Sequence, residues 1–317
     1  MKKVCRSVRY LLIFFALGSA GACTRSASDP QPVGSPTGPS GTVSLELTDA
    51  PIDDASVQGV FVTVAQVKID GKVFPAFTGK KTINVLALQN GNVESLGLSR
   101  LEAGTYSNIS LVLDYSTDAS GNAPGCYVLS TGNQKYNLAE GGKQQVELKA
   151  AKALDVKENA QTSLVMDLDL RKAVKDNNGA SAGGYQFASE NELQSMVRLV
   201  SKERTGAVTG KCSNTGSNRK VVVFAYPKGQ FNKSAEVNSQ FQGAVTSAAV
   251  DGNGTYKLSF LEEGNYELYF AGYQTSQNAT TFQGLLQLNG ALNLNSVSVK
   301  SGAEVRLDVS LGGLLSL

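Results

Sequence analysis

Hydrophobic and polar residues alternate along several stretches of the chain. The clearest cover residues 43–48, 109–114 and 164–170, where every second side chain is a large apolar one. A period of two is typical of a β-strand that buries one of its faces. Each stretch is therefore predicted to be a half-buried strand whose polar side chains face solvent.

Turn sequences lie between these stretches. Asn90-Gly91, the segment 227–229 and the glycine-rich segment 251–254 are typical of tight connections between strands. Only residues 171–175 and 191–196 have a pattern that favours short helices. Because strands and turns follow one another without long helical segments, the sequence predicts an all-β fold of the sandwich type.

Two similar segments suggest a repeated corner in the fold. Residues 101–106 read Leu-Glu-Ala-Gly-Thr-Tyr and residues 261–266 read Leu-Glu-Glu-Gly-Asn-Tyr. In each, the glycine allows a tight turn and the tyrosine enters the next strand, where its hydroxyl can bond to the backbone as in tyrosine corners. The likeness fits either a repeated sandwich or a common turn that arose twice.

The 277 residues from Gly41 to the end exceed the length of a usual single domain. A polar segment at 201–206 separates two hydrophobic runs. We therefore predict two β-sandwich domains, at residues 41–203 and 206–317.

The first 22 residues have the pattern of a signal peptide. Four basic residues precede an apolar stretch at 10–17, which small residues follow. This stretch is shorter than the about 20 residues that cross a bilayer. The run Ala20-Gly21-Ala22-Cys23 resembles the bacterial lipoprotein box, although Ala20 stands where leucine is usual. We predict lipidation of Cys23 and anchoring in a membrane; the alternative is an ordinary secretory signal cleaved near Ala22.

Residues 23–40 are predicted to be a flexible tether. They are rich in Ser, Pro and Gly and contain few apolar side chains, so they cannot form a core. In an extended form, such a segment would span up to roughly 50 Å. Thr24 follows the cysteine where aspartate would favour inner-membrane retention, so the predicted location is the cell envelope, with the outer membrane favoured.

Composition excludes several classes of function. The chain contains no histidine, which excludes Ser-His-Asp and Cys-His hydrolases. Loss of residues 1–22 would remove four positive charges from a net charge of +2 and leave −2. Basic residues are scattered, so nucleic acid is not an expected partner.

Acidic residues provide the candidates for a metal site or for catalysis. Asp49, Asp53 and Asp54 flank Pro51 and could bind Ca²⁺ through hard oxygen ligands. The alternative is that Asp49 caps a turn, because the usual calcium-loop pattern is absent both here and at Asp251.

A second acidic pair lies on one face of a predicted strand. Asp167 and Asp169 are two residues apart, and Arg171 could pair with them. A glycosidase would need two such carboxylates to meet in a cleft. The alternation instead favours a solvated face.

Cys126 and Cys212 could form a disulfide in an oxidising envelope. The bond would close an 87-residue loop between the two predicted domains. Two separate thiols are the alternative.

Four segments resemble landmarks of an uncharacterised bacterial lipoprotein domain family of unknown function. They are Leu47–Asp53 (L-T-D-A-P-I-D), Ile83–Gly91, Leu101–Tyr106 and Leu164–Lys172, within residues 41–200. Most of 206–311 resembles the carboxypeptidase regulatory-like, transthyretin-like sandwich, on the segments 206–210, 221–226, 251–266 and 297–311. Modules of that kind are non-catalytic, so the resemblance implies an accessory role.

Together these patterns predict a lipid-anchored, non-catalytic envelope protein with a binding or structural role. An envelope protein or a glycan is the expected partner. Exposed tyrosines and amide-rich loops such as Tyr273–Thr281 suit either one; the alternative is that they are ordinary surface loops. The rivals are an envelope hydrolase that uses carboxylates and a calcium-dependent glycan-binding protein. No cofactor is expected apart from Ca²⁺.

Overall fold

Strands make up most of the described residues, which confirms the all-β fold. The computed structural model describes residues 36–50, 56–139, 142–150, 152–176, 184–194, 196–214, 216, 219–275 and 280–315. The predicted signal peptide, Cys23 and most of the predicted tether lie outside these ranges. Among the described helices, none is both long and apolar enough to span a bilayer.

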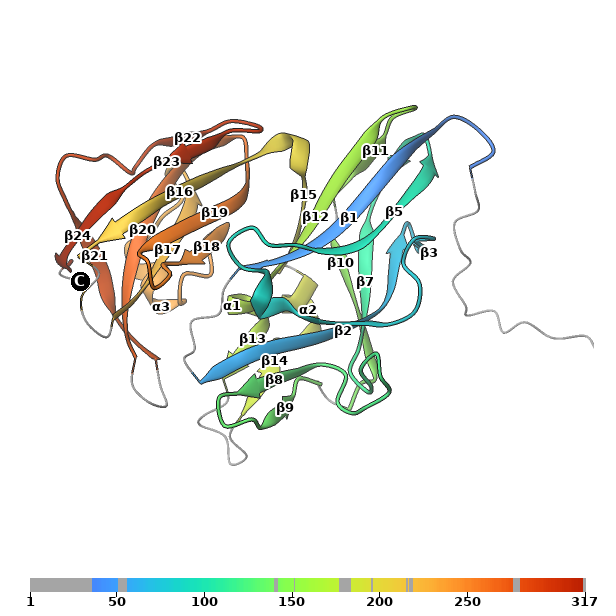
Figure 1. The fold of residues 1–317 in the computed structure, drawn as a ribbon, viewed down its shortest axis with the longest axis horizontal. Coiled ribbons are helices and arrows are strands. Elements are labelled where there is room, and N and C mark those ends of the chain that lie inside the picture. The colour runs from blue at the N-terminus through green and yellow to red at the C-terminus, as the bar shows by residue number, and fades with distance from the viewer. Residues whose placement is uncertain are drawn as a thin grey trace, which may run out of the picture. The chain divides into compact units, whose positions relative to one another are not determined.

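The first sheet has four strands in the order β15-β12-β1-β5 (Figure 1). β1 runs parallel to β12 from Thr42 opposite Gln161 to Ala50 opposite Asp169, whereas the pairs β1–β5 and β12–β15 are antiparallel. The bounds are β1 (Ser40–Ala50), β5 (Glu94–Glu102), β12 (Gln161–Asp169) and β15 (Val197–Ser201).

The second sheet has seven strands and packs against the first. Its path is β10-β7-β2-β8-β9, with β3 and β4 paired to β2. The bounds are β2 (Val57–Ile69), β3 (Lys72–Val73), β4 (Lys81–Asn84), β7 (Ile109–Asp114), β8 (Tyr127–Ser130), β9 (Lys135–Asn137) and β10 (Gln145–Ala150). Both sheets contribute buried side chains to one hydrophobic cluster that is drawn from residues 43–199, so they form a sandwich.

Short elements complete this part of the chain. Two small antiparallel pairs are β6 (Gly104–Tyr106) with β11 (Leu154–Val156) and β13 (Val174–Asp176) with β14 (Tyr185–Phe187). The helical turns are η1 (Val85–Leu88), α1 (Leu170–Ala173), α2 (Glu190–Gln194) and η2 (Lys202–Arg204). α1 and α2 occupy the two regions that the sequence pattern favours for helices.

The remaining strands form one nine-stranded sheet, along the path β18-β17-β20-β21-β24-β16-β19 with β22 on β20 and β23 on β16. Its elements are β16 (Thr205–Ser213), β17 (Arg219–Pro227), α3 (Lys233–Asn238), β18 (Thr246–Ala249), β19 (Thr255–Glu262), β20 (Gly264–Thr275), β21 (Thr280–Asn289), β22 (Val297–Val299), β23 (Glu304–Arg306) and β24 (Val309–Leu314). One hydrophobic cluster takes side chains from β16, β17, β19, β20, β21, β22 and β24, and a second, aromatic one lies on β17, β20 and β21. α3 has no counterpart in the sequence prediction.

No hydrophobic cluster includes residues from both 43–199 and 208–311. Residues 31–317 nevertheless form one compact unit. The division into two independent domains at 203–206 stays a prediction.

The two similar corner segments have the predicted hydrogen bond. The hydroxyl of Tyr106 donates to the carbonyl of Glu102 at 2.9 Å, and that of Tyr266 donates to the carbonyl of Glu262 at 2.7 Å. Gly104 has a φ of 155°, a conformation that favours glycine. Both corners therefore share the tyrosine hydrogen bond, whereas only the first has its glycine at a positive φ.

Two strands differ from the half-buried prediction. All six residues of β7 are buried, and so are residues 164–169 of β12. The polar side chains of Asp114, Asp167 and Asp169 thus lie inside the protein instead of on a solvated face. Alternation identifies the face that joins a core, but it does not show whether other parts of the chain cover the opposite face.

Candidate functional site: a buried ionic cluster

The ends of β1 and β12 bring three carboxylates into the protein interior. Asp49 is 7% exposed, Asp167 3% and Asp169 6%. The two strands are parallel neighbours and run side by side (Figure 1), and Asp49 lies opposite Leu168 in the ladder, between the two other aspartates. Two of the four segments that carry the family resemblance therefore meet here.

Asp169 is paired with two cations that follow it in the chain. Arg171 Nε and Nη2 donate to its two oxygens at 3.1 and 2.6 Å, and Lys172 Nζ lies 3.2 Å from Oδ2. The chain turns into α1 directly after Asp169, which brings the arginine back to the strand end. The predicted pairing of Arg171 with the acidic pair is confirmed for Asp169.

Asp167 is paired across the sheet. Arg198 lies opposite it on β15, and Arg198 Nη2 donates to Asp167 Oδ2 at 2.7 Å. Arg198 is not among the residues predicted from the sequence, because the register between β12 and β15 depends on distant pairing and no local motif marks it. Residues 197–200 read Val-Arg-Leu-Val, which is not an alternating pattern, so no local signal would have identified this arginine.

The same cations also bind main-chain oxygens of the nine-stranded sheet and its connections. Arg171 Nη1 donates to Phe241 O at 2.9 Å, Lys172 Nζ to Ala244 O at 3.1 Å, and Arg198 Nη1 to Phe260 O at 2.8 Å. Residues 40–201 and the later strands are therefore joined through this cluster.

Two of these carbonyl groups belong to residues with left-handed backbone. Phe241 has a φ of 61° and Phe260 a φ of 55°, which costs a non-glycine residue roughly 1–2 kcal/mol. Phe260 lies in the irregular part of β19, between the pairs of Leu258 and Leu261 with β16. Charge-assisted hydrogen bonds, such as those that the two arginines donate, are stronger than neutral ones and help to hold both backbone conformations.

Asp49 has a different environment from the other two carboxylates. Its Oδ1 accepts from Leu170 N at 3.2 Å, and its Oδ2 is buried without a hydrogen-bond partner among the described residues. Desolvation, followed by the nearby charge of Asp167, raises the pKa of Asp49 well above its usual value. The Leu170 bond and Arg171 act in the opposite direction but do not reverse this shift.

In the described ranges, no group of three or more Asp, Glu, Cys or His side chains is placed to hold a metal. Asp53 and Asp54 lie outside these ranges, so the calcium site with Asp49 stays a prediction. The alternative, in which Asp49 caps the turn at Pro51, also stays a prediction, because residues 51–55 lie outside these ranges; within them Asp49 accepts from Leu170 N, 121 residues away.

The two cysteines do not form the disulfide that the sequence left open. Cys126 and Cys212 are both free and buried. Each belongs to a different hydrophobic cluster, and Cys126 Sγ donates to Asp114 O at 3.3 Å. Burial raises the pKa of both thiols to about 12. The structure therefore contains two separate thiols, and both are buried and unreactive.

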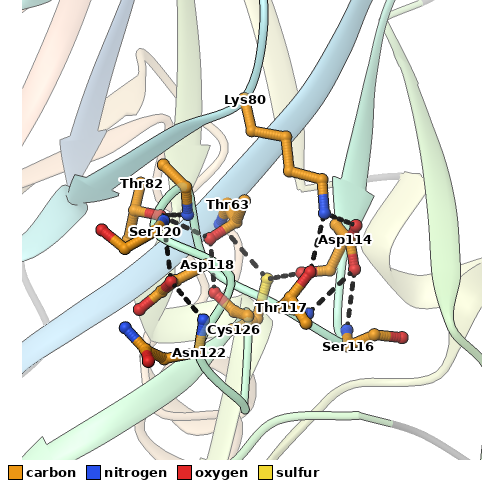
Figure 2. A network of polar contacts seen from close by, with 12 residues as sticks. Thr63, Lys80, Thr82, Asp114, Ser116, Thr117, Asp118, Ser120, Asn122 and Cys126 are labelled. Atoms are coloured by element: carbon orange, nitrogen blue, oxygen red, sulfur yellow. Dashed lines mark hydrogen bonds and ion pairs between the residues drawn. The ribbon is translucent and has the colours of Figure 1, made fainter.

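A second polar network holds the loop between β7 and β8 (Figure 2). Lys80 Nζ lies 2.5 Å from Asp114 Oδ2, and Asp114 Oδ1 accepts from the backbone of Ser116 and Thr117 at 2.8 and 3.2 Å. Asp118 similarly accepts from the next turns of the loop, and the backbone N–H of Asn122 lowers its pKa. These acceptors are occupied by the loop's own backbone, so the network is structural.

The amide-rich loop 273–281 is described only in part. Tyr273 is buried, and its ring meets Phe282 edge-on at 5.6 Å between centroids. The expectation that Tyr273 is exposed is wrong, because its side chain packs into the aromatic cluster on β17, β20 and β21. Residues 276–279 lie outside the described ranges.

Residues 40–188 match the model of a domain family of unknown function, DUF4382. The match covers all four segments that carry the family resemblance, and it ends before Arg198. No curated protein matches the chain.

Solved structures with a detectable likeness are distant. A leucine-rich repeat protein from Bacteroides thetaiotaomicron is 12% identical to this chain, with a TM-score of 0.20. The alignment covers 88% of this chain and 27% of that protein. BcpA, the major pilin subunit of Bacillus cereus, is 13% identical over 86% of this chain and 70% of its own (TM-score 0.22). The fimbrial anchor protein Mfa2 from Porphyromonas gingivalis is 12% identical, and the alignment covers 84% of this chain and 90% of Mfa2 (TM-score 0.19). At such TM-scores these likenesses carry no argument about function.

Proposed function

We propose that this protein is a non-catalytic, lipid-anchored component of the bacterial cell envelope with a structural or binding role. The non-catalytic role is supported by the partners that the buried charges have in the structure. The cations of the cluster bind carboxylates and main-chain oxygens at the same time, so they hold segments of the fold together. A catalytic carboxylate pair would instead need access to a substrate.

The anchoring part of the proposal rests on the N-terminal sequence. The basic start, the short apolar stretch and the small residues before Cys23 fit a lipoprotein signal. More than one acyl chain on a single cysteine would give stable attachment, because each buried methylene contributes about 0.8 kcal/mol. The attached body is the all-β part of the chain.

Metabolic labelling with radioactive palmitate tests the anchor. We expect label on the wild-type chain and none on Cys23→Ser. Cys5→Ser is the matched control, because Cys5 lies within the predicted leader and its loss should leave labelling unchanged. Label that persists on Cys23→Ser would refute lipidation at this cysteine.

A binding role is tested with the full chain carrying Cys23→Ser, immobilised and exposed to an envelope extract. We expect retention of an envelope protein or glycan, and a column that carries heat-unfolded protein serves as control. Hydrolysis of an envelope glycan or peptide by the purified chain would instead support the rival hydrolase and refute the non-catalytic role.

A further inference from the structure

The contact between residues 40–201 and residues 205–315 is polar, and we call it the junction. Arg171 and Arg198 cross it and donate to main-chain oxygens at 2.9 and 2.8 Å. None of the hydrophobic clusters formed by the described residues spans it. Parts of one chain are expected to move relative to each other unless a large apolar interface joins them. The junction therefore has the character of an interface that can open.

Several polar atoms at the junction are buried without a hydrogen-bond partner among the described residues. They are Asp167 Oδ1, Arg198 Nε, Ser247 Oγ and Ser259 Oγ. Such a group destabilises the folded form, because it has lost its hydrogen bonds to water and gained none in return. Opening the junction would return these atoms to water, so part of the free energy needed to separate the two parts is recovered.

The burial of Ser259 depends on the junction being closed. Its side chain is covered by Gly91, where an added Cβ would lie 2.5 Å from Ser259 Oγ. The hydroxyl of Thr48 on β1 donates to Asn92 O at 2.8 Å and holds this turn beside the first sheet. Ser259 itself belongs to β19 of the nine-stranded sheet. A residue of one part thus covers a side chain of the other.

Ser247 lies at the junction as well. It is 5% exposed on β18, which lies against β1, and it is opposite Phe224 in the ladder with β17. Residues that are directly opposite in an antiparallel pair share a face of the sheet. The guanidinium carbon of Arg171 lies 5.3 Å from the centre of the Phe224 ring. The face that carries Ser247 is therefore the face that Arg171 contacts from the other part.

The chain crosses from one part to the other through the single turn η2. Glu203 accepts from Ser163 N at 2.9 Å and is thereby fixed to β12. Thr205 is the first residue of β16 in the nine-stranded sheet. The turn itself is held by the N–H and hydroxyl of Thr205, which both donate to Lys202 O. Hinges are often a few residues at the ends of elements, and rotation at Glu203 and Arg204 would move one part against the other.

We infer that the folded protein opens at the junction by rotation about η2, while each part keeps its own fold. The arginine bonds to main-chain oxygens hold the closed form, and opening exposes Ser247 and Ser259 to solvent together. Opening of this kind is a local transition that needs less free energy than global unfolding. The inference goes beyond the proposed envelope role and does not depend on the lipid anchor.

Thiol labelling of the full chain measures this opening. Cys5→Ser and Cys23→Ser remove the two N-terminal thiols, and Ser259→Cys or Ser247→Cys then places one new thiol at the junction. Iodoacetamide is applied at several urea concentrations below the unfolding transition, and mass spectrometry of peptides gives the rate at each cysteine. Circular dichroism melting shows that each variant is folded.

The two native cysteines serve as controls in the same molecule. Cys126 belongs to the hydrophobic cluster of residues 43–199 and Cys212 to a cluster of the later strands, and both are buried. We expect each junction thiol to react at least tenfold faster than either of them. Its rate should also depend less steeply on urea, because opening exposes less surface than unfolding does.

A third serine provides the matched control for the substitution. Ser110 lies on β7, is 0% exposed and donates to Glu147 instead of facing the junction. The thiol of Ser110→Cys should react as slowly as Cys126. Both junction thiols should give the same opening free energy, because one rotation exposes both.

Two outcomes would overturn the hinge. Junction thiols that react only at the rate and urea dependence of Cys126 would show that the junction opens only when the protein unfolds. Rapid reaction at one junction thiol alone would show local fraying of a loop instead of a rotation about η2. The palmitate result would stand in both cases.

Discussion

Replacing Asp49 by asparagine tests the electrostatics of the buried cluster. Asparagine has nearly the same shape and keeps an oxygen that can accept from Leu170 N, but it cannot ionise. Desolvation and the neighbouring Asp167 raise the pKa of Asp49 in the folded protein. The folded chain therefore keeps a proton on Asp49 at pH values where the unfolded chain has lost it.

The sign and size of the effect follow from this difference. The stability contributed by protonated Asp49 is fully present below the unfolded-state pKa, 3.8, and is lost as pH rises through the folded-state pKa. Between the two pKa values, the wild type loses about 1.4 kcal/mol of unfolding free energy per pH unit relative to Asp49→Asn. The variant should match the wild type near pH 3.5 and become progressively more stable than it above pH 4.

Urea unfolding at pH 3.5, 5, 6 and 7 measures the two free energies. Asp118→Asn is the control, because Asp118 is exposed and the backbone N–H of Asn122 lowers its pKa. The stability that ionised Asp118 contributes is present above its unfolded-state pKa and is lost at low pH, so its trend has the opposite sign. A difference between Asp49→Asn and the wild type that does not change with pH would refute the raised pKa of Asp49.

Three further substitutions or reactions test other parts of the structure. Asp169→Asn removes the charge that Arg171, whose side chain is 6% exposed, pairs with at 2.6 Å. It should lower the unfolding free energy by about 3–5 kcal/mol in urea titrations, and a loss under about 1 kcal/mol would contradict the buried pair. Gly125→Ala would place a Cβ 2.2 Å from a main-chain oxygen and should lower the unfolding free energy by about 1–3 kcal/mol. The Cβ of Gly252→Ala would meet no atom within 4 Å, so this control should lower the unfolding free energy by less than about 0.5 kcal/mol in the same urea titration. Burial raises the pKa of Cys126 to about 12, so iodoacetamide at pH 8 should modify it only in urea, as mass spectrometry would show; equal rates with and without urea would argue against burial.

Local patterns in the sequence predicted the elements of the fold well. Alternation at 43–48, 109–114 and 164–170 corresponds to β1, β7 and β12. Both tyrosine corners form as predicted, because their hydrogen bonds span only four residues and depend on the local turn. Local patterns also indicate α1 and α2. They do not indicate α3, because its six residues carry no apolar stripe of the kind that marks a helix.

The candidate site required information that local patterns do not contain. Asp167 and Asp169 follow the alternation of β12, yet both are buried because their face of the strand is also covered. Arg198 reaches Asp167 through the register of β15, and the carbonyl groups of Phe241 and Phe260 come from much later in the chain. The sequence could show that acids and bases are present near 167–172, but only the long-range pairing shows which partners they have.

The cluster is better explained by positioning than by added stability. Removing two charges from water costs about as much as their attraction returns, so a buried ion pair is by itself weak evidence for stability. Arg171 and Arg198, however, each bind a carboxylate and a main-chain oxygen of a residue with left-handed backbone. An apolar replacement of either pair could fill the same volume, but it could not donate to Phe241 O or Phe260 O. The carboxylates therefore orient the arginines, and the arginines fix the turn at Phe241 and the irregular part of β19 at Phe260.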